Sequence, residues 1–427
     1  MKNKLQKKAP SPLTAVFTTI FIDLLGVGIL IPVMPLLVTP GEYRITPDYW
    51  SIKGGFILLG WLTAAYPIAQ FLAAPILGQL SDRHGRKRVL AYSIFGTAVG
   101  YAIFAYGILS KNIGLLFLGR IIDGLTGGNI SVAQAAVSDV STPANRAKNF
   151  GRVGMAFGLG FVIGPYIGGK LADPSVVSWF HTSTPFWFAM FLSLANTLFV
   201  LFKFPETHSK PSGEPMDWAR SITNVRHAVT MPGVRAVMPT VFLFTGGFTF
   251  FTTFFGVILR QKFGFSQGNI GDYFAYVGIC IATAQGLVVA VVSKKLKDYQ
   301  VLRFAVAGTA VALALYAWVS NYHWLFAVAP LMAIFNGLSF ANMPTIVSRV
   351  APDGNRGEAL GISSSVQALA QGILAAMSGY IASISQSKVV LTGAAVVLLG
   401  QIAFWVFFGP QRHRKTEHDH PEFAGSH

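Results

Sequence analysis

Long apolar segments alternate with short polar ones along almost the whole chain. A helix that crosses a lipid bilayer needs about 20 predominantly apolar residues, and the chain holds twelve segments of about that length. They lie near residues 14–38, 56–80, 89–109, 114–138, 149–171, 184–204, 236–259, 271–293, 302–320, 323–347, 357–383 and 389–409. The pattern therefore predicts an all-α membrane protein with twelve transmembrane helices.

The widest polar break, over residues 205–235, separates two sets of six segments. It is rich in proline and shows little apolar periodicity, so we interpret it as a cytosolic linker. The predicted parts are a basic N-terminus, a first six-helix half, the linker, a second six-helix half and a tail, at 1–13, 14–204, 205–235, 236–410 and 411–427.

The two predicted halves also share a short sequence pattern. Five identical residues recur at an offset of 210 positions: Ser138/Ser348, Val140/Val350, Asn145/Asn355, Arg146/Arg356 and Gly151/Gly361. Parallel repeats of this kind are a transporter architecture, with the substrate site between the halves near the midplane. We expect two pseudo-symmetric halves.

Composition agrees with a membrane protein. Hydrophobic residues make up 52% of the chain and charged residues 12%, about half the charge of a soluble domain. Cys280 is the one cysteine, which excludes a disulfide framework and a cysteine-rich metal site. The first apolar segment is too long for the core of a signal peptide, so we expect it to be retained as a span.

Basic residues are distributed unevenly between the two sides. If the N-terminus is inside, 25 of the 33 lysines and arginines lie in inner segments and seven in outer loops, and Arg120 lies within a span. This bias is the positive-inside rule. It predicts a multi-pass protein of the bacterial inner membrane with both termini cytosolic, and it explains the net charge of +16 without nucleic acid.

The loop after the second segment reads GQLSDRHGRKRVL. A basic cytosolic loop accounts for its charges but not for its glycines and aspartate. The loop resembles the G-x-L-[SA]-D-R-x-G-R-[RK] motif of the major facilitator superfamily. The resemblance implies that its acid docks against the start of helix eleven as a conformational latch. The expected gate residues are Gly78, Asp82, Arg83, Gly85 and Arg86, with Asp139 at the end of the fourth span.

The fifth segment carries glycines at four-residue spacing around a proline. This spacing gives one smooth helical face, and such packing is common in membrane helices. The stretch also resembles the antiporter motif of drug/proton exchangers, which involves Gly160, Gly164, Pro165, Gly168 and Gly169. GPYIGGKL has the spacing of a phosphate loop, but Leu171 stands where Ser or Thr would bind Mg²⁺, so we reject nucleotide binding.

Asp23 lies deep in the first apolar segment. A buried aspartate is expensive in hydrocarbon, and it lowers that cost by taking a proton, since desolvation favours the neutral form. A proton-exchanging site is therefore chemically natural. The surrounding pattern of glycines and prolines resembles the first span of tetracycline/proton antiporters, in which this acid is coupled to protons.

The fourth segment contains Arg120 and, three residues later, Asp123. The pattern R-x-x-x-G-x-x-G matches the same family, and the resemblance gives Arg120 a role in proton transfer near Asp23. Asp123 departs from the family, where a small or apolar residue is common. Either Asp123 simply neutralises Arg120 at i,i+3, or Arg120 is shared between Asp23 and Asp123 and moves between them.

Residues that line the substrate cavity are less well defined by sequence. Gln134 follows the small and polar face of the fourth segment, and Phe251 belongs to a phenylalanine cluster that could receive a flat ligand or serve packing. Cavity lining and ordinary helix–helix hydrogen bonding are equally open for the polar candidates of the second half, including Gln285, Asn336 and Gln367.

The expected function is proton-coupled efflux antiport of amphipathic, tetracycline-like or multidrug compounds by alternating access. The alternatives are a proton-coupled symporter or lipid/metabolite translocase on the same fold, and a non-transporting receptor or scaffold. We expect no enzyme activity, no metal and no cofactor besides protons. The expected partners are a small-molecule substrate and membrane lipid, without nucleic acid or nucleotide, and the chain is expected to be monomeric.

Overall fold

The computed structural model describes residues 12–41, 43–142, 146–208, 216–352 and 355–408, and every regular element in these ranges is a helix. The first half contains α1 (Pro12–Ile29), η1 (Met34–Leu37), α2 (Ile52–His84), α3 (Arg86–Leu109), α4 (Ile113–Thr126), α5 (Asn129–Asp139), α6 (Arg146–Leu171) and α7 (Thr184–Lys203). The remainder contains α8 (Arg220–Thr230), α9 (Val234–Phe263), α10 (Gln267–Thr283), η2 (Ala284–Val288), α11 (Val289–Lys295), α12 (Asp298–Trp318), α13 (Tyr322–Val350), α14 (Arg356–Ile384), α15 (Gln386–Ala403) and η3 (Phe404–Phe408).

Ten of the predicted spans are long and apolar enough in the described residues to cross a membrane. The all-α membrane fold is therefore confirmed. The other two predicted spans correspond to α6 and to α10 with η2 and α11. Glycines and basic residues lower the hydropathy of α6, and the π-helical turn η2 interrupts the other span after 17 residues of α10.

Successive long helices run in opposite directions through the bundle. We call the end at which α1 begins and η3 ends the terminal face, and the other end the distal face. Several helices that start on the distal face are capped by a polar side chain, which satisfies a backbone N–H left free in the first turn. The capping residues are Ser51, Asn112, Ser266 and Asn321.

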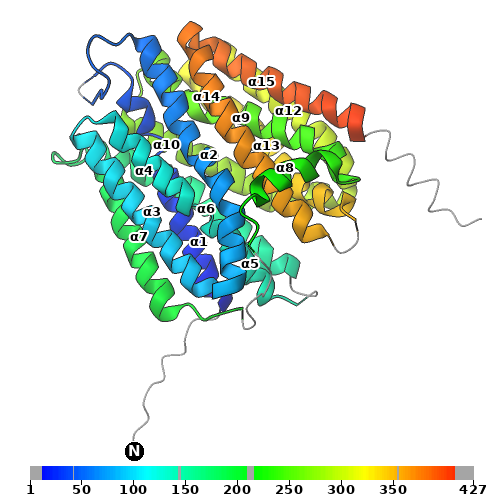
Figure 1. Cartoon of the computed structure of the whole chain (residues 1–427). Coiled ribbons are helices and arrows are strands. Elements are labelled where there is room, and N and C mark those ends of the chain that lie inside the picture. The colour runs from blue at the N-terminus through cyan, green and yellow to red at the C-terminus, as the bar shows by residue number, and fades with distance from the viewer. Residues whose placement is uncertain (1–11, 42, 143–145, 209–215, 353–354, 409–427) are drawn as a thin grey trace, which may run out of the picture.

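The helices pack into two halves that contact each other mainly through two pairs. Within the first half α1 packs on α6, and α3 packs on α4 and α7. Within the second half α9 packs on α15, and α12 packs on α13. Between the halves, α2 lies along α14 and α6 along α10 (Figure 1).

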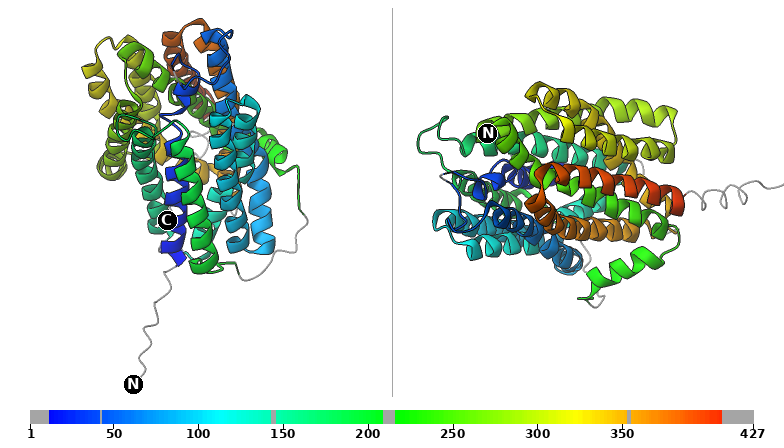
Figure 2. Two further views of the ribbon diagram at one scale, coloured as in Figure 1. Left: turned by 90° about the vertical axis from the view of Figure 1, so that its left-hand side faces the viewer. Right: turned by 90° about the horizontal axis from the view of Figure 1, so that it is seen from above.

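The predicted linker, residues 205–235, contains the helix α8. Its apolar residues, including Ile222, Val225 and Val229, are spaced three and four apart, which is a helical period that the neighbouring prolines and charges obscured. Figure 2 shows α8, in bright green, on the outside of the bundle. The second half also begins earlier than predicted, at Val234. Most of the predicted N-terminus and the whole predicted tail fall outside the described residues.

The fourth predicted span, 114–138, is two helices rather than one. α4 ends at Thr126 and α5 begins at Asn129, with Gly127 and Gly128 between them. The break frees backbone groups in the middle of the bundle, and Gln70 Nε2 donates to the carbonyl oxygen of Gly127 at 2.7 Å. Discontinuous helices of this kind are common at transporter sites. They are tolerated there because neighbouring side chains form hydrogen bonds with the freed backbone N–H and C=O groups.

Candidate functional site

Asp23 lies on α1 in the interior of the first half, with 7% of its surface exposed. Asn129, the first residue of α5, donates from Nδ2 to Asp23 Oδ1 at 2.7 Å. The Oδ1 atom of Asn129 is buried without a hydrogen-bond partner among the described residues. Sequence reasoning missed Asn129, although its position directly after the Gly127–Gly128 pair is the signal that could have found it.

Arg120 and Asp123 form an ion pair on α4. Arg120 Nη1 lies 3.3 Å from Asp123 Oδ2, and the two side chains are 11% and 4% exposed. The guanidinium also lies over the ring of Tyr66, 4.8 Å from its centroid. In this conformation Asp123 is therefore the acid that pairs with Arg120, as the simpler of the two sequence hypotheses expects, and Asp23 bonds to Asn129 instead.

Two tyrosines complete the surroundings of these charges. The ring of Tyr66 lies against the guanidinium group of Arg120, and the Tyr66 hydroxyl accepts a hydrogen bond from Gln70 Nε2 at 3.2 Å. The hydroxyl of Tyr101 is buried without a hydrogen-bond partner in the described part of the chain, as is Arg120 Nε. A narrow gap beside the ion pair is lined by both Tyr101 and Arg120. The site therefore contains buried hydrogen-bond donors and acceptors that have no partner among the described residues.

The glycines of α6 hold the helix that carries Asp23. Gly160 packs on Leu24, and a Cβ atom added to Gly164 would lie 2.8 Å from the Cα atom of Gly28. Such close approach requires glycine on both helices. Two further residues of the predicted motif continue the contact with α1: Gly168 lies against Ile29 and Pro165 against Gly28. Gly169 instead packs on Gly271 of α10, in the other half.

The loop between α2 and α3 forms a charged cluster on the terminal face. Arg86 is buried and pairs with Asp82 at 2.6 Å and with Asp139 at 3.0 Å. Gly85 has φ +92°, a conformation that favours glycine. Glu206, which follows α7, accepts hydrogen bonds from the backbone N–H groups of Arg86 and Lys87 at the start of α3.

This cluster therefore ties α2, α3, α5 and the end of α7 together within the first half. Arg83 is exposed beside it. The eleventh predicted span corresponds to α14. Among the described residues Asp82 forms its ion pair with Arg86 and not with the start of α14. Glu206 escaped sequence reasoning, because a single acid after an apolar segment carries no motif.

The two halves meet on the distal face. Lys170 of α6 pairs with Asp272 of α10 at 2.8 Å. Asp173, which follows α6, accepts a hydrogen bond at 3.1 Å from the backbone N–H of Gly268 in the first turn of α10. Trp61 of α2 donates to the hydroxyl of Tyr380 on α14 at 3.1 Å. These contacts close the distal end of both interfaces between the halves.

The same helix pairs are open towards the terminal face. Cβ atoms added to certain glycines in this region would meet no atom within 4 Å, and these glycines are Gly78 of α2, Gly158 of α6, Gly286 of η2 and Gly361 of α14. Gly78, one of the expected gate residues, therefore borders open space in this structure. The two helix pairs are thus joined directly at the distal face, and glycines nearer the terminal face on the same helices border open space.

The five predicted cavity residues are not joined into one site by the described contacts. Phe251 is 2% exposed and stacks on Phe255, with ring centroids 4.3 Å apart, so it does not line a cavity in this structure. Efficient packing of aromatic rings in the second-half core explains this burial.

The polar candidates are also held locally. Asn336 is buried, and its Nδ2 donates to Met332 Sδ on the same helix at 3.9 Å. Gln367 donates to Ser363 on its own helix, and Gln285 lies in η2 beside Gly337. Gln134 is partly exposed on α5.

Comparison with known proteins gives a consistent picture. The family model of the Major Facilitator Superfamily matches residues 16–330 and 237–425. The class C tetracycline resistance protein of Escherichia coli is 30% identical over 398 residues, which cover 92% of this chain and 96% of that protein.

Two solved structures share the fold. The human organic anion transporter MFSD10 (TETRAN) superimposes with a TM-score of 0.70 at 21% identity, covering 92% of this chain and 98% of that one. A D-xylose-proton symporter superimposes with a TM-score of 0.73 at 17% identity, covering 92% and 97%. At these identities the likeness of the structures concerns the fold alone.

Proposed function

This chain belongs to the major facilitator superfamily, and on that premise we propose that it exports amphipathic, drug-like compounds in exchange for protons. It is an integral multi-pass membrane transporter, and its similarity to a tetracycline resistance protein supports export of tetracycline-like or more varied compounds. The observation that carries the proposal is the buried carboxyl group of Asp23 in hydrogen-bond contact with Asn129. The proposal needs no cofactor other than the coupling proton.

The Asp23–Asn129 pair suits both protonation states of the acid. The ionised carboxylate accepts the hydrogen bond that Asn129 Nδ2 now donates. A protonated carboxyl group becomes a donor, and the unused Oδ1 atom of Asn129 can accept from it after a rotation of the amide. The proton can therefore be gained and lost while Asp23 and Asn129 stay hydrogen-bonded, with one of the two amide atoms of Asn129 used in each state.

The Arg120–Asp123 pair supplies the second part of the proposed mechanism. While Asp23 is ionised, the site contains two buried acids and the single positive charge of Arg120, which pairs with Asp123. Protonation of Asp23 removes one negative charge and leaves Arg120 to Asp123, so the charge of the site changes by one unit. We propose that this change alters the affinity for substrate, which is what exchange of substrate against protons requires.

Alternating access gives the exchange its direction. The positive-inside rule supports a cytosolic terminal face, so the open terminal side would admit substrate from the cytosol of a bacterial inner membrane. Reorientation would then release the substrate outside and load Asp23 with a proton there. The open space beside Gly78, Gly158 and Gly361 supports an inward-facing state.

Transport by purified protein in proteoliposomes tests this function. With an imposed pH gradient, wild-type protein should accumulate a fluorescent tetracycline in the more acidic compartment, from which the protons leave. Asp23→Asn should abolish this accumulation. Counterflow at equal pH should persist in the variant, since it needs no net proton movement. Asp48→Asn, in an exposed loop, is the matched control. Proton-driven uptake by Asp23→Asn at the wild-type rate, or uptake in the direction of symport, would contradict the proposal.

A further inference from the structure

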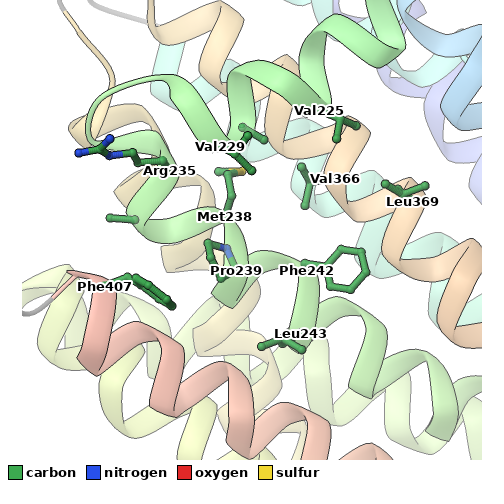
Figure 3. A pocket seen from close by; sticks show the side chains of 12 residues that line it. Val225, Val229, Arg235, Met238, Pro239, Phe242, Leu243, Val366, Leu369 and Phe407 are labelled. Atoms are coloured by element: carbon green, nitrogen blue, oxygen red, sulfur yellow. The ribbon is translucent and has the colours of Figure 1, made fainter.

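An apolar groove of about 680 Å³ lies on the outside of the second half, next to the linker helix. α8 forms one wall through Val225 and Val229, and α14 contributes Val366 and Leu369. The start of α9 forms another wall, and Phe407 of η3 closes the far side (Figure 3). The groove therefore joins the linker to three separate parts of the second half.

One charged residue lines this groove. Arg235, in the first turn of α9, is exposed, and none of the ion pairs among the described residues involves it. Figure 3 shows its guanidinium group at one end of the groove, with Met238, Pro239 and Leu243 following along α9. The groove is thus apolar along its length and positively charged at the end near the terminal face.

The outer face of α8 carries large apolar side chains together with the exposed arginines Arg220 and Arg226. Trp218, just before the helix, and Ile222 and Val229 within it are 69%, 67% and 67% exposed. The opposite face is polar and bonded to the bundle: Ser221 donates to the carbonyl oxygen of Leu72 on α2, and Asn224 donates to Ser365 on α14. A surface helix that exposes large apolar side chains together with arginines is suited to the boundary between lipid and water.

The dimensions of the groove match one leaflet of a bilayer. From Arg235 to Leu243 the helix rises about 12 Å, and half of a hydrocarbon core is about 15 Å. An acyl chain fits the apolar walls over this length, and its phosphate group would then lie at Arg235. Basic residues near a membrane surface attract anionic headgroups.

We propose that this groove binds an anionic phospholipid of the leaflet at the terminal face, with its phosphate on Arg235 and an acyl chain between α8, α9 and α14. The lipid is bound and not transported. Because α8 is hydrogen-bonded to both α2 and α14, the bound lipid stabilises the linker that joins the two halves. This site is separate from Asp23 and does not depend on proton coupling.

Native mass spectrometry of the full-length protein in detergent tests the proposal, with phosphatidylglycerol and phosphatidylcholine of identical acyl chains added in equal amounts. The wild-type protein should retain phosphatidylglycerol preferentially. Arg235→Ala should reduce this preference about fivefold, the factor expected for one basic residue near a headgroup. Val225→Trp, which narrows the groove, should reduce retention of both lipids.

Arg88→Ala is the matched control, because Arg88 is an exposed arginine on the terminal face of the first half. It should leave the preference unchanged. Thermal unfolding of each variant without added lipid checks that the fold is intact, and lipid retention is compared only among folded variants. An unchanged preference in Arg235→Ala would overturn the proposal, and so would equal retention of both lipids by the wild type. A neutral amphipathic compound could also displace the lipid. If it does so equally well in the wild type and in Arg235→Ala, the groove binds that class of compound and the proposal is overturned.

Discussion

Three ionisable side chains in the first half differ in what they can do, because their partners differ. Asp23 has an amide partner that can change from donor to acceptor. Asp123 and Arg120 are partners of opposite charge that neutralise each other. The first arrangement tolerates a change of protonation, whereas the second resists the loss of either member, since an unpaired charge in the interior is costly.

Removal of Arg120 alone should therefore destabilise the protein. Arg120→Leu leaves Asp123 buried without its counter-charge, and a loss of about 3 kcal/mol is expected from this kind of change. The double variant Arg120→Leu/Asp123→Asn removes both charges and should recover most of that loss. Thermal unfolding in detergent at neutral pH measures both. If the double variant is no more stable than Arg120→Leu, the pair does not act as this ion pair predicts.

At the scale of elements, the contact between α1 and α6 decides where Asp23 lies. The glycine stripe of α6 allows the two backbones to touch, and Asp23 follows from α1 into the interior. Sequence spacing predicted a smooth face on this segment, and the structure identifies α1 and α10 as the helices that it meets.

Two alanine substitutions on α6 separate close packing from helix propensity. Gly164→Ala adds a Cβ atom 2.8 Å from the Cα atom of Gly28 and should cost about 1–3 kcal/mol through overpacking. Gly158→Ala makes the same chemical change where no atom lies within 4 Å, and it should be neutral or slightly stabilising, because alanine favours helix over glycine. Thermal unfolding compares the two variants, and equal effects would show that packing against α1 is not the cause.

At the scale of the whole molecule, the distal face is held closed by a few polar contacts between the halves. Partial burial alone raises the pKa of Asp173, but hydrogen bonds from Ser175, Gly268 and Ser266 together outweigh it and hold the pKa below its usual range. The closed distal face therefore favours the ionised carboxylate. Its stabilising contribution is present above the usual aspartate pKa and is lost as the pH falls through the lowered value.

Neutralisation of Asp173 should consequently open the distal face. Asp173→Ala removes the acceptor for the Gly268 N–H and should shift the population towards a wider distal separation at neutral pH. Spin labels at the exposed positions 179, in the loop after α6, and 262, in the last turn of α9, measure this by their distance distribution. The wild type should show the same shift only in acid, and Asp173→Ala should lose that pH dependence. An unchanged distribution in the variant would contradict the role of this contact.

The sequence by itself determined the membrane fold, the positions of most spans and the family. Apolar length and the distribution of basic residues are local properties of the chain, and lipid requires each spanning segment to satisfy its own backbone. The same locality explains why Asp23, Arg120 and Asp123 could be singled out, since a charge in an apolar segment is visible without knowledge of its neighbours.

Only the tertiary structure decided which groups meet. The partnership of Asp23 with Asn129, the break after Thr126 and the burial of Phe251 depend on helices packed side by side. The position of the linker helix α8 on the bundle has the same origin, because its polar face finds hydrogen-bond partners on α2 and α14 that no local pattern reveals. Contacts between residues more than 100 positions apart are fixed by packing and shape, and hydrophobic periodicity carries no information about them.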